Sequence, residues 1–176
     1  MDNSRAGGSI LQPILTLLAA ILLIAYVVGA LNTGNWVWFL PIQPKFEPTR
    51  ILVRDQGQSI EYRDGVTGFI ELKRALDLAL ADFSNSDLVP LGLSDETLLE
   101  YNQSAVVVEV YYPEDIRFNT AVRMRNVNKL LIPIEGRHAG NRYIFLGTDG
   151  SWLTGAMVMA DDAPLHEALR QLGHIH

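Results

Sequence analysis

Cysteine is absent from this chain of 176 residues. Its absence excludes disulfide bonds, zinc sites with thiolate ligands and catalysis by a thiolate nucleophile. Histidine is scarce as well, and none of its four copies is paired at the i, i+4 spacing of a helical HExxH motif. We therefore predict no metal site and no cofactor. We expect His174 and His176 to be exposed in the C-terminal tail, and His138 to lie at an exposed loop tip. His166 is expected to be a surface or half-buried residue of the last helix.

The common catalytic motifs are missing too. The sequence has no G-x-S-x-G elbow, S-x-x-K motif, P-loop, EF-hand loop or dinucleotide fingerprint. The acidic pair Glu114-Asp115 follows a proline and is typical of a turn, while Asp161-Asp162 suits the cap of a helix. We predict no catalytic residue, and expect the protein not to be an enzyme. An active site assembled by folding, such as that of a hydrolase, stays an alternative because catalytic triads are defined by geometry rather than by order.

Basic residues are outnumbered, at 14 against 20 acidic ones, so the net charge is −6. An acidic chain is a poor candidate for nonspecific nucleic-acid binding. The charges are also unevenly placed: residues 85–116 hold seven acids and no base, and residues 117–142 hold six bases and one acid. Either these segments pair with each other, or they form a polarised surface for a partner. The candidate partner or anion patch comprises Arg117, Arg123, Arg125, Lys129, Arg137 and Arg142.

Charge is entirely absent from residues 10–31, which form one long apolar run. As a helix this run reaches about 33 Å, enough to cross a hydrocarbon core of about 30 Å. We predict a transmembrane signal anchor that contacts the lipid bilayer. A cleaved signal peptide is the alternative, because Val28-Gly29-Ala30 resembles a cleavage site. Arg5 precedes the run closely and the first basic residue after it is Lys45, so we expect a cytoplasmic N-terminus and an extracytoplasmic domain at the cell membrane.

An aromatic and proline-rich segment, residues 32–49, follows the apolar run. Trp36, Trp38 and Phe39 suit the headgroup level of a bilayer, although they could instead pack on the domain. The spacing of the prolines at positions 41, 44 and 48 predicts an extended spacer. The predicted organisation is thus a tail over residues 1–9, a span over 10–31, this linker over 32–49, and one soluble domain over 50–176.

Residues 50–176 predict an α+β domain, with a mainly antiparallel meander sheet and two to three helices packed on one face. A hairpin around "QGQ" comes first, and Phe69, Leu72 and Leu76 then mark the core face of a helix. Ser94 is expected to cap a second helix. The remaining expected elements are strands over 105–112, 116–127 (one bent or two short), 129–135, 142–147 and 152–160, and a last helix over 161–173. Pro133 indicates that its strand is an edge or bulged strand.

Taken together, these features predict a membrane-anchored, non-enzymatic interaction or accessory protein. Its expected partner is another membrane protein or a larger membrane complex. A sensor of anions or small ligands is an alternative, with Arg117, Arg123 and Arg125 as the binding residues.

Overall fold

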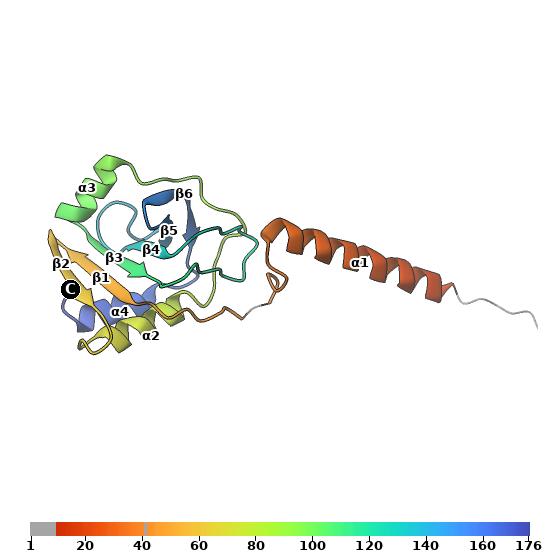
Figure 1. Ribbon diagram of the computed structural model, residues 1–176, viewed down its shortest axis with the longest axis horizontal. Helices are drawn as coiled ribbons and strands as arrows, with labels where there is room; N and C mark the ends of the chain where they lie inside the picture. The colour runs from red at the N-terminus through yellow and green to blue at the C-terminus, as the bar shows by residue number, and fades with distance from the viewer. Residues whose placement is uncertain (1–9, 41) are drawn as a thin grey trace, which may run out of the picture.

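The computed structural model describes residues 10–40 and 42–176, so the predicted tail and Pro41 lie outside the described residues. A long helix, α1 (Leu11–Thr33), projects away from the rest of the molecule (Figure 1). Most of its large apolar side chains are exposed, from 51% at Leu18 to 66% at Leu31. The helix is long and apolar enough to cross a membrane. It ends at Gly34, whose φ of 68° is a left-handed conformation that glycine adopts easily.

Six strands form one sheet in the order β2-β1-β3-β4-β5-β6, and every neighbouring pair is antiparallel. The strands are β1 (Arg50–Asp55), β2 (Gln58–Tyr62), β3 (Val106–Tyr111), β4 (Lys129–Pro133), β5 (Tyr143–Thr148) and β6 (Ser151–Val158). Gln56 and Gly57 join β1 to β2 with φ values of 47° and 87°, as a two-residue hairpin turn requires. The predicted α+β class with an antiparallel meander is therefore confirmed.

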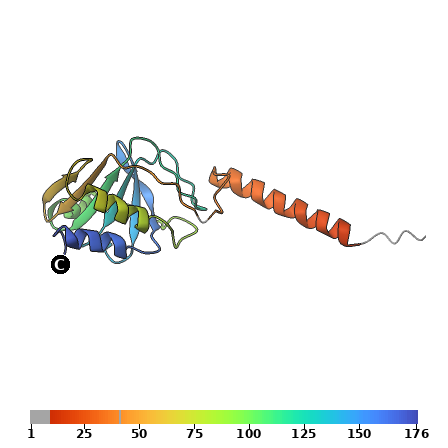
Figure 2. The same ribbon diagram turned by 90° about the horizontal axis from the view of Figure 1, so that it is seen from below.

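Two helices, α2 (Phe69–Ala79) and α4 (Ala163–Gln171), cover one face of the sheet (Figure 2). Successive residues of a strand point to opposite faces, so Val108 joins these helices in the larger core while Val107 points away. A third helix, α3 (Asp95–Gln103), lies over the second face, where Tyr101 packs with Val107, Leu131 and Phe145. Ser94 caps α3 by accepting a hydrogen bond from the Thr97 N–H, as predicted.

The strand expected between positions 116 and 127 is not formed. Residues 112–128 make a long β3–β4 loop that reaches toward α1 (Figure 1). Side chains still alternate along it: Val122 and Met124 are buried in the core, and Arg123 and Arg125 are exposed. The pattern that predicted a strand was therefore correct about burial and wrong about pairing, because no neighbouring strand lies beside this extended segment.

The prediction that the Pro133 strand is an edge or bulged strand is wrong, because β4 lies between β3 and β5. Proline is tolerated at position 133 because no strand there needs its N–H as a hydrogen-bond donor. Its missing N–H would point toward β5, since the next residue, Ile134, donates to Val106 of β3. The β4–β5 ladder has already ended at the pair Leu131–Phe145. No ladder hydrogen bond is therefore lost.

Candidate functional site at the junction of helix and domain

The β3–β4 loop is bonded to the end of α1. The guanidinium of Arg117 donates to the carbonyl oxygen of Gly34, directly after the last turn of the helix. The carbonyl groups at a helix C-terminus have no partner within the helix and carry partial negative charge. A cation at this point stabilises the end of α1 and connects it to the domain.

Asn119 of the same loop holds the segment that leaves the helix. Its side-chain oxygen accepts from the Asn35 amide at 2.8 Å. Its backbone N–H donates to Gln43 Oε1 at 2.7 Å, and its carbonyl oxygen accepts from Gln43 Nε2 at 3.1 Å. The Asn119 amide also donates to the carbonyl of Ile42. We call the contacts of Arg117 and Asn119 with residues 34–43 the junction clamp.

The three aromatic residues predicted as membrane-interface anchors fold back onto the last turns of α1. The Tyr26 hydroxyl donates to the carbonyl of Trp36 at 2.9 Å, and the Tyr26 and Phe39 rings meet edge to face at 5.7 Å. A Cβ atom on Gly29 would lie 2.8 Å from the Trp38 ring, so the ring requires a glycine there. Trp36 and Phe39 remain 56% and 54% exposed. Their packing partner is chiefly the helix rather than the domain.

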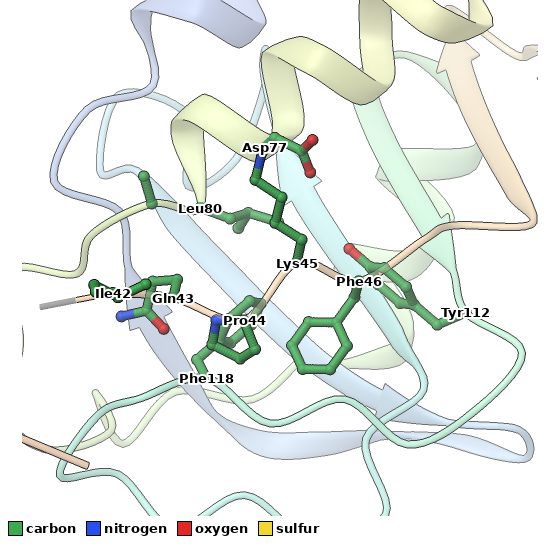
Figure 3. A pocket seen from close by; sticks show the side chains of 10 residues that line it. Ile42, Gln43, Pro44, Lys45, Phe46, Asp77, Leu80, Tyr112 and Phe118 are labelled. Atoms are coloured by element: carbon green, nitrogen blue, oxygen red, sulfur yellow. The ribbon is translucent and has the colours of Figure 1, made fainter. Parts of the chain in front are cut away.

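Residues 42–47 form a strap across the end of α2 and line three cavities of about 240, 360 and 230 Å³. In the first, Lys45 extends toward Asp77 of α2, and Phe46, Tyr112 and Phe118 supply aromatic walls (Figure 3). Phe46 meets Tyr112 and Phe118 edge to face at 6.2 and 5.8 Å. The strap therefore roofs the core at the end of the domain nearest α1.

Asp77 of α2 is half-buried and lines this cavity. Burial raises its pKa, and the ammonium groups of Lys45 and Lys73 oppose that rise. Burial also raises the pKa of the Tyr112 hydroxyl, and the nearby Asp77 charge adds to the effect. No Ser, Thr or His is found among the described residues that line this cavity, so it offers no hydroxyl or imidazole nucleophile beyond the Tyr112 phenol.

The structure does not gather the six residues of the predicted basic patch on one surface. Arg117 belongs to the junction clamp, and Arg142 donates to the Ala160 carbonyl. Lys129 lies over the Trp152 ring, 4.4 Å from its centroid. Arg123 and Arg125 line a cavity of about 430 Å³ beside Leu88, Met124, Val127, Leu146, Leu153 and Thr154. The sixth, Arg137, lies at α3.

Arg137 pairs the basic segment with the acidic one. Its guanidinium lies 3.1 Å from Glu100 Oε2 and 3.2 Å from Glu96 Oε1, and its backbone N–H donates to Glu100 at 2.9 Å. Of the two explanations for the uneven charges, mutual pairing therefore applies at Arg137. This pairing fastens the β4–β5 loop to α3.

His138 is half-buried, so the expectation of an exposed loop tip is wrong. Its Nδ1 lies 2.8 Å from the hydroxyl of Tyr101, and its ring lies 5.4 Å from that of Phe145. Burial lowers the pKa of His138 and the charge of Arg137 lowers it further, while Glu100 opposes the change. The imidazole thus packs between α3 and β5 in surroundings that favour its neutral form.

The expectation of an exposed tail is wrong for His174, whose side chain is only 3% exposed. Its two ring nitrogens contact Tyr62 and Asp55, which lie on the β1–β2 hairpin. Ile175 is buried beside it, and only His176 is exposed as expected. In the sequence, the neighbouring apolar residue Ile175 was only a weak indication that His174 is buried.

A second polar cluster lies on the sheet itself. Glu109 of β3 is 5% exposed, and its carboxylate accepts from Arg54 Nε of β1 at 2.6 Å. The hydroxyl of Tyr111 donates to the same carboxylate. Arg50 lies over the Tyr111 ring, 3.8 Å from its centroid. The members of this cluster bind one another, so it is a structural network.

Within residues 10–40 and 42–176, no three His, Asp or Glu side chains are grouped as metal ligands would be. Comparison with protein-family models, with curated proteins and with solved structures finds no significant match to this chain. The junction is therefore interpreted from its own geometry. Asn119 and Gln43, which hold it together, carry no sequence pattern that would have marked them in advance.

Proposed function

We propose that this protein is a membrane-anchored interaction or accessory protein, and that its domain acts on another membrane protein or complex from a fixed position at the bilayer surface. The observation that carries the proposal is the combination of α1 with the junction clamp. An exposed apolar helix anchors the chain, and the clamp fixes the domain to the end of that anchor.

The exposure of α1 supports the anchor. A helix with large apolar side chains exposed on every side is unfavourable in water, because each such side chain buried in hydrocarbon contributes about 1.5–3 kcal/mol. The domain covers almost none of this surface. A bilayer is the environment that satisfies the whole circumference of the helix at once.

The aromatic residues beyond α1 support a position at the interface. Trp36 and Phe39 are exposed next to the last turn, where indole and phenyl rings favour the headgroup level. The domain begins at β1 soon afterwards and is tied back by Asn119. We infer a single-pass protein whose N-terminus is cytoplasmic and whose domain lies outside the cytoplasm.

Alkaline carbonate extraction tests the anchor. Wild type should remain in the membrane pellet, and a variant with Leu17→Glu, Ile21→Glu and Ile24→Glu should be released, because charged residues at the centre of a span are strongly disfavoured. The intact mass of the membrane-bound protein distinguishes a retained anchor from a cleaved signal peptide. Release of the wild type, or loss of residues 1–30 from its mass, would contradict the proposal.

Orientation can be tested with one engineered thiol, since the chain has no cysteine. Ser59→Cys places it on an exposed residue of β2. A membrane-impermeant maleimide should label this variant in intact cells. Labelling only after lysis would place the domain in the cytoplasm and reverse the inferred topology, while leaving the anchor in place.

The interaction role needs a control that keeps the anchor. The full chain, at native expression, is crosslinked in membranes and captured from detergent. The control joins residues 1–49 to an unrelated soluble domain. A membrane protein that is captured by the full chain and not by the control supports the role, and recovery of this chain alone contradicts it.

A further inference from the structure

We propose that Arg123 and Arg125, on the β3–β4 loop, bind the anionic headgroups of the bilayer in which α1 is anchored. The proposal rests on the proposed function, since it needs the anchor. It adds a lipid-binding surface and a preference for the charge of the membrane.

The side chains of Arg123 and Arg125 have no polar partner in the described part of the protein. Unlike Arg117 and Arg137, Arg123 and Arg125 make no ion pair or hydrogen bond with any residue in the described part of the chain. Acids outnumber bases across the protein, so internal partners are plentiful. Two exposed guanidinium groups on one short stretch are thus left available for an external anion.

Buried neighbours in the β3–β4 loop orient both arginines outward. Val122, Met124 and Val127 are buried and hold the loop to the core. The alternating residues Arg123 and Arg125 must therefore face outward together. Their positions are set by the packing of their neighbours, so the pair is presented on a fixed surface.

The β3–β4 loop lies next to the end of α1. Arg117 and Asn119, a few residues earlier on the same loop, contact the end of α1 and the residues that follow it. Figure 1 shows this loop at the end of the domain that faces the helix. When α1 lies in a bilayer, the loop is held close to the headgroup level. Two free arginines at this level would be attracted to a bilayer surface that carries anionic lipids.

The apolar surroundings also fit a lipid. The cavity beside the two arginines is lined by Leu88, Leu153 and other apolar side chains. Exposed Trp36, Phe39 and Ile42 lie near the end of the anchor. Arginine next to apolar surface matches an anionic phospholipid, which carries a phosphate beside glycerol and acyl carbons.

The test uses the full chain in nanodiscs of phosphatidylcholine alone or mixed with phosphatidylglycerol. A single fluorophore is attached at Thr154→Cys, an exposed position on the wall of this cavity. Lipids with a nitroxide on the headgroup act as quencher. The control probe is at Ser59→Cys in β2, near the β1–β2 turn and therefore at the opposite end of β1 from the linker.

We expect the Thr154 probe to be quenched roughly twofold more in the anionic nanodiscs, because electrostatic attraction draws the loop to the surface. The double variant Arg123→Gln/Arg125→Gln, or high salt, should return quenching to the phosphatidylcholine value. Arg123→Lys/Arg125→Lys should retain most of the effect. Arg74→Gln, which removes an exposed arginine from α2, should change nothing. An unchanged melting temperature of each variant shows that the domain is still folded.

Three results would overturn the proposal. Quenching that is independent of phosphatidylglycerol or of both arginines, in chains that have inserted, refutes lipid binding and leaves the anchor intact. Loss of a captured membrane protein in the double variant, with no change in quenching, assigns this surface to a protein partner. Failure of the chain to co-purify with nanodiscs refutes the anchor itself, and with it the function proposed above.

Discussion

The hydroxyl of Tyr62 lies 2.8 Å from Nε2 of His174, although the two residues are 112 positions apart in the sequence. The other ring nitrogen of His174 lies 3.3 Å from the carboxylate of Asp55. The imidazole therefore joins the C-terminal tail to both strands of the β1–β2 hairpin. The outer strand of this hairpin, β2, is at the edge of the sheet and pairs with β1 only.

Replacement of His174 should weaken the domain. His174→Ala removes both contacts and leaves the buried Tyr62 hydroxyl without its partner, so we expect a loss of about 2–3 kcal/mol in the free energy of unfolding. Chemical unfolding of the full chain in mild detergent measures this loss. The matched control is His176→Ala at an exposed position, which should stay within about 0.5 kcal/mol of wild type. Equal effects of the two changes would show that the tail does not fasten the hairpin.

The buried carboxylate of Glu109 depends on Arg54. Arg54→Met keeps much of the side-chain volume and removes the charge that lies 2.6 Å from this carboxylate. An uncompensated charge at a residue that is 5% exposed is costly, and we expect a loss of about 2–4 kcal/mol. Adding Glu109→Gln should recover part of the loss, as thermal or chemical unfolding can show. A double variant no more stable than Arg54→Met would contradict this account.

The lowered pKa of His138 makes stability depend on pH. The folded state favours the neutral imidazole, whereas the unfolded chain takes up a proton near the ordinary value of 6.5. As the pH falls below 6.5, the unfolded state binds protons first, and stability should decline until the pH passes below the folded pKa. Above 6.5 this residue should have no effect.

His138→Asn provides the comparison, because asparagine suits the φ of 68° at this position. Melting temperatures of both proteins are measured from neutral pH down to pH 5. Wild type should lose more stability than the variant over this interval. Parallel curves would mean that another group is responsible for any acid sensitivity.

Gly29 permits the aromatic segment to fold back on α1. Gly29→Ala places a methyl group 2.8 Å from the Trp38 ring, so the ring must move away from the helix. In a Trp36→Phe/Trp152→Phe background, where Trp38 is the sole tryptophan, acrylamide should quench its fluorescence more strongly. Val28→Ala, at an exposed position of the same helix, should leave quenching unchanged. Equal quenching in all three chains would show that Trp38 does not pack at Gly29.

Most of the fold could be predicted from local patterns. The apolar period of α2, the cap at Ser94 and the turn signals between strands depend on neighbouring residues, and the elements formed where these patterns indicated. The predictions of an edge or bulged strand at Pro133 and of a strand over residues 116–127 were wrong. Strand pairing depends on which segments are neighbours in the folded protein, and local sequence does not specify this. A proline is harmless where the ladder has ended, and an alternating segment remains a loop where no strand is adjacent.

The candidate site was harder to predict, for the same physical reason. The junction clamp depends on Asn119 and Gln43, which are 76 positions apart and lie in segments without periodicity. The uneven charge distribution was visible in the sequence, but only folding separates arginines that have partners from those that do not. Arg137 pairs with Glu100 across 37 positions, whereas Arg123 and Arg125 form no ion pair or hydrogen bond with any described residue.

The junction clamp also has a mechanical consequence. A proline-containing linker between an anchor and a domain would ordinarily act as a swivel, in which the helix could turn without moving the domain. Here Arg117 donates a hydrogen bond to Gly34, directly after the last turn of α1, and Asn119 accepts one from Asn35, the next residue. We therefore expect a twist or tilt of α1 to act on the β3–β4 loop through these hydrogen bonds, instead of being absorbed in the linker.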